Sequence, residues 1–231
     1  MDILHQLEKQ LVVSCQALEH EPLHSAKIMG RMARAAEEGG AKGIRANSIQ
    51  DIKEIKQQVN VPIIGIIKRE YTGSDVYITP TLREVKELLA VGVDMIALDA
   101  TERKRPNNER LEDIVKYVKN NHSDVALMAD VSTIAEAIKA EKIGFDCIST
   151  TLVGYTEYTQ GQNITDQDFA RLKDMVHAVS RPVVAEGKID TPQKANEALT
   201  NGAHFVVVGS AITRPQIITK TFADAITHNK K

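Results

Sequence analysis

Eight short runs of residues rich in Val and Ile, each followed by a longer segment of helical period, constrain the fold of this chain more than any other feature. The runs cover residues 11–15, 43–46, 62–68, 94–99, 125–130, 145–150, 182–186 and 204–209. Near-continuous apolar strands are typical of a parallel sheet buried on both faces, and intervening helices supply the crossover connections. The alternation therefore predicts an α/β fold built on a parallel sheet.

A repeat in the helical segments narrows this prediction to one architecture. A glycine closes every second segment, and the positions are Gly40, Gly92, Gly144 and Gly202. Glycine in that place ends a helix in the left-handed conformation. The steps between these glycines correspond to about two βα units each, and eight such units fit a (β/α)8 TIM barrel. An open, doubly wound sheet is the rival, but no GxGxxG turn supports it. We expect one barrel domain over 1–231, with 1–10 as a short N-terminal segment.

The charge balance and the cysteines bound the possible partners and the compartment. The net charge is −2, from 29 basic and 31 acidic residues. Because nucleic acids and anionic membranes bind clustered Lys and Arg, we expect neither as a partner, and we expect the single basic cluster at 103–105 to be a solvated loop. No stretch reaches the roughly 18 apolar residues of a membrane span, and the N-terminus lacks the apolar core of a signal peptide. Cys15 and Cys147 lie in apolar runs, which indicates buried free thiols and a cytoplasmic protein.

The ends of the runs supply the candidate site. In a (β/α)8 barrel the residues at the C-terminal ends of the strands line the active site. Strand ends are also polar because they meet water, so each position alone is a weak indication. Function is favoured most for Lys68 and Glu186, because each of them ends a run that is otherwise apolar. The remaining polar candidates at these ends include Gln16, Arg45, Asp130 and Thr150.

Small residues after the seventh and eighth runs predict a phosphate site. Gly187 follows the seventh run, and Gly209 and Ser210 follow the eighth, ahead of Arg214. Small residues let backbone N–H groups approach an anion, and a short helix beginning near Ser210 would add its N-terminal dipole. Arg214 would supply a charge-assisted bond to the same phosphate. The alternative is that these glycines only permit tight turns, but their pairing in two neighbouring loops favours phosphate.

Two further observations concern ligands. No HxH, HExxH or CxxC spacing occurs, so no metal site is expected. The loop after the sixth run holds about fifteen residues, a length that often marks a functional loop. Tyr155 and Tyr158 lie in this loop, and we expect it to bring Tyr158 to the substrate.

The strand-end segments resemble the N-acetylmannosamine-6-phosphate 2-epimerase family. In chain order they are SCQALEHEPLHS, GGAKGIRAN, PIIGIIKREY, IALDAT, LMADVST, GYTEYTQGQ, VVAEGKIDTP and GSAITRP. The resemblance runs from about residue 11 to residue 227. It implies a cytoplasmic barrel of bacterial sialic-acid breakdown that interconverts N-acetylmannosamine 6-phosphate and N-acetylglucosamine 6-phosphate without a metal or redox cofactor. It also implies a homodimer whose small-molecule partner is an amino-sugar phosphate.

The same resemblance assigns roles to individual residues. It implies that Lys68 and Glu186 are the catalytic pair. It places substrate contacts at Gln16, Arg45 and Asp130, to which the strand end adds Thr150 and the long loop adds Tyr158. It places phosphate contacts at Gly187, Gly209, Ser210 and Arg214. The position after Gly187 is Lys188, and its role stays open.

Epimerisation at the carbon that bears the acetamido group needs a base and an oxyanion stabiliser, because the intermediate is an enolate of the open-chain aldehyde. Lys68 must be neutral to act as this base. Apolar neighbours and the charge of Arg45 are expected to lower its pKa toward the range of catalytic lysines. Lys68 and Glu186 end the third and seventh strands, on opposite sides of the ring, which favours two participating groups over one base.

Two other functions remain compatible with these residues. Lys68 is also a candidate for Schiff-base formation, which would make the chain an aldolase-like lyase. The barrel is otherwise a candidate for a non-catalytic sensor of a phosphorylated sugar. The near-neutral charge and the intact pair of Lys68 and Glu186 argue against a sensor that binds RNA.

Overall fold

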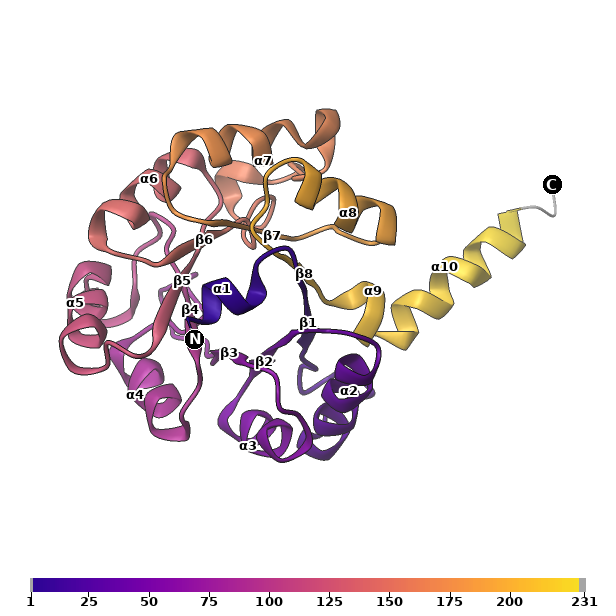
Figure 1. The fold of residues 1–231 in the computed structure, drawn as a ribbon, viewed down its shortest axis with the longest axis horizontal. Helices are drawn as coiled ribbons and strands as arrows, with labels where there is room; N and C mark the ends of the chain where they lie inside the picture. The colour runs from indigo at the N-terminus through magenta and orange to yellow at the C-terminus, as the bar shows by residue number, and fades with distance from the viewer. Residues whose placement is uncertain (1, 229–231) are drawn as a thin grey trace.

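Eight parallel strands close into a barrel in the order of the sequence, with the first strand paired to the last (Figure 1). The computed structural model describes residues 2–228. The strands are β1 Leu11–Cys15, β2 Gly43–Asn47, β3 Ile63–Ile66, β4 Met95–Asp99, β5 Ala126–Asp130, β6 Cys147–Ser149, β7 Val183–Glu186 and β8 Val206–Val208. The predicted (β/α)8 barrel is confirmed, and the rival open sheet is wrong.

Helices surround the barrel (Figure 1). Those that follow strands are α2 Ala26–Glu38, α3 Ile49–Gln58, α4 Leu82–Val91, α5 Leu111–Asn121, α6 Ile134–Ile143, α7 Asp166–Ala178, α8 Pro192–Thr200, α9 Ser210–Thr213 and α10 Pro215–His228. A short helix, α1 Ile3–Leu7, precedes β1, and two 3-10 turns cover Pro106–Asn108 and Glu157–Thr159. No helix within residues 2–228 is long and apolar enough to cross a membrane.

The helix ends explain the sequence repeat. Gly92 and Gly144 end α4 and α6 in the left-handed conformation, at φ 75° and 103°, as predicted. Gly40 and Gly202 have φ values of 104° and 100° and follow the final residues of α2 and α8. A side chain at these φ values would be strained, so glycine is what allows the chain to leave the helix and enter the next strand.

Two apolar layers hold the barrel together. The larger lies between the strands and the surrounding helices. The smaller fills the barrel interior, with Ile64, Met95 and Cys147 among its members, and Ile3 and Leu7 of α1 pack against it from the N-terminal end of the strands. Figure 1 shows α1 lying across that end of the barrel. The interior is therefore closed at one end and opens only at the C-terminal ends of the strands.

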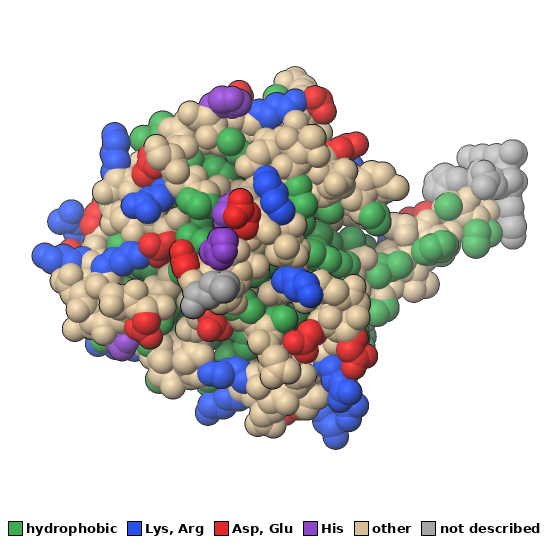
Figure 2. Space-filling view, in the orientation of Figure 1, with side chains coloured by type: hydrophobic (Ala, Val, Ile, Leu, Met, Phe, Trp, Pro, Cys, Tyr) green, Lys and Arg blue, Asp and Glu red, His purple; other side chains and the backbone are tan. Residues whose placement is uncertain are grey.

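The last helix departs from the ring. In Figure 1, α10 extends away from the barrel, and only the four-residue α9 follows β8 within the ring. Figure 2 shows apolar side chains along this projecting helix. Phe222 and Ile226 are 68% and 65% exposed, which is unusual for large apolar side chains on an ordered helix.

One expectation about the surface is wrong. Residues 103–105 do not form a solvated loop, because Arg105 is buried and donates from Nη1 to the Pro80 carbonyl. Arg103 pairs with the buried carboxylate of Asp99. Both cysteines are buried and free, as predicted.

Candidate active site

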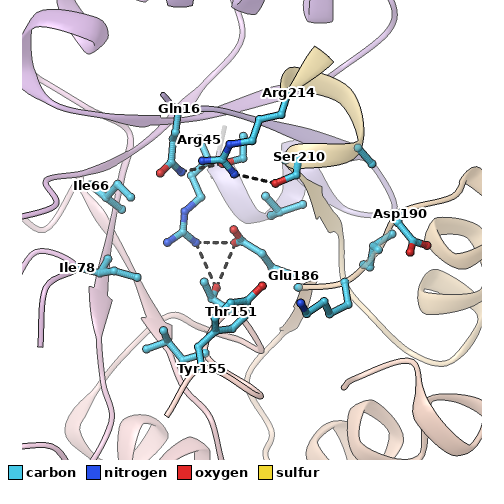
Figure 3. A pocket seen from close by; sticks show the side chains of 18 of the residues that line it. Gln16, Arg45, Ile66, Ile78, Thr151, Tyr155, Glu186, Asp190, Ser210 and Arg214 are labelled. Carbon is cyan, nitrogen blue, oxygen red and sulfur yellow. Dashed lines mark hydrogen bonds and ion pairs between the residues drawn. The ribbon is translucent and has the colours of Figure 1, made fainter. Parts of the chain in front are cut away.

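A cavity of about 500 Å³ opens at the C-terminal end of the barrel, where the strand-end residues converge (Figure 3). Side chains from several strand ends line it, together with the loops after β6 and β7 and the first turns of α9 and α10. The lining includes Gln16, Arg45, Lys68, Glu186, Gly187, Gly209, Ser210 and Arg214. The structure therefore brings together eight of the residues that the sequence predicts for the site.

Arg45 joins the two halves of the barrel at the floor of the cavity. Its guanidinium, from β2, donates to both carboxylate oxygens of Asp130 on β5, at 3.1 and 2.5 Å. It also donates to Glu186 Oε2 on β7, at 2.6 Å (Figure 3). Arg45 is only 1% exposed, and burial of an unpaired charge is unfavourable. The carboxylates of Asp130 and Glu186 compensate the charge of this guanidinium. Its Nε is buried and has no hydrogen-bond partner among the described residues.

Lys68 lines the same cavity beside Ile66 and Ile78. Within residues 2–228 its Nζ makes no hydrogen bond or ion pair, while its backbone N–H donates to the Asn47 side chain. Burial lowers the pKa of Lys68 to about 8, and the charges of Arg45 and Arg214 act in the same direction. An amine with this pKa is partly neutral near pH 7 and has a lone pair available for proton transfer.

The carboxyl group of Glu186 faces the cavity with one oxygen uncommitted. Its Oε2 accepts from Arg45 and lies 3.2 Å from the Thr151 hydroxyl, while Oε1 accepts no bond from the described residues. Burial raises the pKa of Glu186, and the neighbouring Asp130 charge adds to this, against the opposing charge of Arg45. Oε1 is therefore the oxygen of this group that can exchange a proton with a ligand.

The opposite wall of the cavity suits an anion. Gly187 has φ 108°, a left-handed conformation that favours glycine, and Gly209 packs beside Ser14, whose side chain an added Cβ would meet at an ordinary contact distance of 3.4 Å. Ser210 begins α9, as predicted, and Arg214 Nη1 donates to the Ser210 hydroxyl at 2.7 Å (Figure 3). These small residues keep the backbone open to a phosphate beside a guanidinium.

Three predicted substrate contacts do not line the cavity. Asp130 is fully buried behind Arg45. Thr150 points into the sheet, where its hydroxyl donates to the Glu186 carbonyl, and the next residue, Thr151, faces the cavity instead. The Tyr158 hydroxyl donates to the buried carboxylate of Glu136 in the first turn of α6. In this structure Asp130, Thr150 and Tyr158 bond to neighbouring protein groups, and their contact with substrate stays a prediction.

The sequence analysis missed or left open three other residues that line the cavity, and it missed Glu21 beside the cavity. Thr151, which lines the cavity, directly follows the predicted Thr150. Tyr155 lies at the mouth, with the Lys188 Nζ 5.3 Å from its ring centre, and both line the cavity. Glu21, in the loop after β1, pairs with Arg214 at 2.5 Å and lies in a segment without strand or helix periodicity. No cluster of three metal-ligating acidic, His or Cys side chains occurs within the described residues.

Comparison with known proteins identifies the family. The model of the NanE family, described as "Putative N-acetylmannosamine-6-phosphate epimerase", matches residues 29–228. This chain belongs to that family. The resemblance predicted from the strand-end segments is thereby confirmed.

Relatives and solved structures agree with this membership. A protein of the same name from Shouchella clausii is 62% identical over 97% of this chain and 98% of its own length. One from Clostridioides difficile is 56% identical over 98% of this chain and its whole length. The solved N-acetylmannosamine-6-phosphate 2-epimerase of Clostridium perfringens is 53% identical, with a TM-score of 0.93 over 97% of this chain and 96% of that one. A thiamine phosphate pyrophosphorylase from Pyrococcus furiosus, 23% identical with a TM-score of 0.61, shares the fold.

Proposed function

We propose that this member of the NanE family interconverts N-acetylmannosamine 6-phosphate and N-acetylglucosamine 6-phosphate by removing and returning the proton at C2. The family membership and the similarity to relatives of that name support this reaction. The observation that carries the chemistry is Lys68, whose amine lines the cavity without a protein partner and has a pKa of about 8. A base of this kind is what abstraction of a proton next to an aldehyde requires.

Lys68 is the proposed base for C2 in the open-chain sugar. With a pKa of about 8, roughly a tenth of the enzyme carries the neutral amine at pH 7. Proton removal places negative charge on the aldehyde oxygen, and Arg45 is the buried cation positioned to stabilise it. Asp130 holds Arg45 in place from behind. The reaction moves one proton and changes no net oxidation state, so it requires no redox cofactor.

Glu186 is the proposed acid and base partner of Lys68. The raised pKa of its carboxyl group favours a protonated form that can donate a proton, either to the ring oxygen during opening or to C2 from the second face. Its uncommitted Oε1 supports this role.

The remaining groups fit the acetamido and phosphate ends of the substrate. Gln16 Oε1 is buried without a partner, while its Nε2 donates to Ser14, so Oε1 suits the acetamido N–H. Gly187, Gly209, Ser210 and Arg214 are the proposed phosphate contacts. A firm hold on the phosphate positions C2 against the base, since binding energy away from the reacting carbon orders the reacting atoms.

The test is incubation with N-acetylmannosamine 6-phosphate, followed by NMR for the appearance of the glucosamine epimer. We expect conversion by the wild-type chain and none by Lys68→Ala. Failure of the wild-type chain to convert the sugar would refute the proposed reaction. Trapping of a covalent adduct by borohydride would instead support a Schiff-base lyase at Lys68.

We also propose that the chain forms a homodimer through α10. The large apolar side chains Phe222 and Ile226 are mostly exposed, and the ring sector between α8 and α2 holds only the short α9 (Figures 1 and 2). A second copy placing its α10 over that sector would bury apolar surface on both subunits. Light scattering should give twice the chain mass of 25.5 kDa, and Phe222→Glu should give a monomer. A monomeric wild-type protein would refute this. A cytoplasmic location is proposed from the two buried free thiols.

A further inference from the structure

Arg214 reaches the cavity with two of its five N–H donors already engaged by Glu21, a residue outside the cavity lining. Glu21 Oε1 accepts from Arg214 Nε at 2.5 Å, and Glu21 Oε2 accepts from Nη2 at 2.9 Å. The Ser210 hydroxyl accepts from Nη1 at 2.7 Å. The Glu21 and Arg214 side chains are only 12% and 23% exposed, so solvent screens this pair less than an exposed one.

The planar geometry of the guanidinium decides what this leaves for a ligand. Arginine carries five N–H donors in a fixed fork, and Nε and Nη2 share one edge. Glu21 occupies that edge, and Ser210 takes one donor of Nη1. The two donors beyond these bonds lie on Nη1 and Nη2, the pair that forms the end of the fork. An end-on fork is a bidentate binding surface for phosphate oxygens.

We infer that Glu21 is a positioning residue for the phosphate group, which it serves by fixing the Arg214 guanidinium so that the end of the fork faces the cavity. This inference rests on the proposed phosphate site. It assigns a role to the loop after β1, which also carries Gln16, one of the residues that line the cavity.

The surroundings of Glu21 support a fixed carboxylate. Its Oε2 also accepts from the Leu18 backbone N–H at 2.8 Å, which ties the side chain to its own loop. Gln216, in the first turn of α10, donates to Oε1 at 3.3 Å. Hydrogen bonding from Arg214 is the main reason that the pKa of Glu21 is lowered, so the carboxylate stays charged at neutral pH. Glu21 therefore joins the loop after β1 to the segment that carries Arg214.

A double-mutant cycle on Glu21 and Arg214 tests this role. Glu21→Gln keeps the shape of the side chain but removes its charge. The KM for N-acetylmannosamine 6-phosphate should rise about tenfold, the scale of one lost charge-assisted hydrogen bond, while kcat stays within about twofold. The Ki of inorganic phosphate as a competitive inhibitor should rise by the same factor. In the Arg214→Ala background, Glu21→Gln should raise KM and the phosphate Ki no further, because its effect on phosphate binding passes through the guanidinium.

The matched control is Asp146→Asn. Asp146 also bonds a cation, Lys119 at 2.5 and 2.6 Å, and one backbone N–H, that of Leu127, but it lies at the other end of the barrel. This variant should leave KM and the phosphate Ki unchanged.

Three results would overturn the inference. An unchanged KM in Glu21→Gln, with wild-type turnover intact, would show that Arg214 needs no positioning. A lower KM would show that Glu21 competes with phosphate for Arg214. An equal rise in KM in the Arg214→Ala background would show a general structural role. Absence of turnover in the wild-type chain would instead refute the proposed function, and the phosphate Ki could not then be measured.

Discussion

Replacing Lys68 with methionine should abolish turnover and raise the free energy of unfolding at the same time. Methionine has a similar length and apolar character but carries no charge. The Lys68 amine makes no hydrogen bond or ion pair with the described residues, so the substitution breaks no contact of Nζ. Its charge lies beside those of Arg45 and Arg214, both of which disfavour the protonated form.

The size of the effect follows from the pKa of Lys68. The pKa falls from its ordinary value of 10.5 to about 8 in the fold. That difference corresponds to about 3 kcal/mol, which partial solvent exposure of the side chain reduces to about 1–3 kcal/mol. Below pH 8 Lys68 is protonated in both the folded and the unfolded protein, so the folded protein bears the full free-energy cost of the charged amine. Between pH 8 and 10.5 only the unfolded chain holds the proton, and the cost fades as pH rises.

Urea unfolding at several pH values, together with the NMR assay, checks this prediction. Lys68→Met should be more stable than wild type below pH 8, and the two proteins should converge toward pH 10.5. Lys53→Met, at an exposed position on α3, should change stability by less than about 0.5 kcal/mol and leave turnover intact. A Lys68→Met protein that is less stable than wild type at pH 7, or a difference that does not vary with pH, would refute the reasoning.

Three further predictions concern the site. Arg214→Ala should raise KM by tenfold or more, on the scale of a charge-assisted hydrogen bond of about 1.5–3 kcal/mol. It should also move the rising limb of the pH–rate profile to higher pH, because Arg214 lowers the pKa of Lys68, and an unmoved limb would contradict this second effect. Turnover in D2O should place deuterium at C2 of the product, which NMR detects. Early deuterium in recovered substrate would favour Lys68 as a single base, and unlabelled substrate would favour two bases, Lys68 and Glu186, on opposite faces of C2. Tyr158→Phe should lower the free energy of unfolding by about 1–3 kcal/mol, because it removes a hydrogen bond to the buried Glu136. It should leave kcat unchanged, and a loss of turnover would support Tyr158 as a substrate contact.

The sequence predicts which elements carry the site because parallel strands all end at the same face. Lys68, Arg45 and Glu186 each end an apolar run, and all three line one cavity. The pairing of Arg45 with Asp130 and Glu186 is not readable from the runs, since these residues are 85 and 141 positions away. Only closure of the barrel brings them together.

Errors in the prediction follow from side-chain direction and from loops. The sixth apolar run extends to Thr150 in the sequence, but β6 ends at Ser149. Because neighbouring side chains point to opposite sides near a strand, an error of one residue exchanges Thr150 for Thr151 as the group facing the cavity. Glu21 and Tyr158 lie in loops, where no period indicates direction, so their partners emerge only from the folded chain.

Because α1 covers the N-terminal end of the barrel, the position of the cavity also determines the route by which substrate enters and product leaves. Because apolar side chains fill the barrel interior and Ile3 and Leu7 cover its lower end, substrate and product use the same opening of the cavity. Arg45 is almost fully buried and Arg214 is partly exposed, so a substrate bound as proposed would enter with its sugar end first. In that binding mode, release requires the phosphate contacts to break before the sugar leaves. A higher affinity of Arg214 for the phosphate group would therefore lower KM but slow product release. The turnover rate is highest at an intermediate affinity.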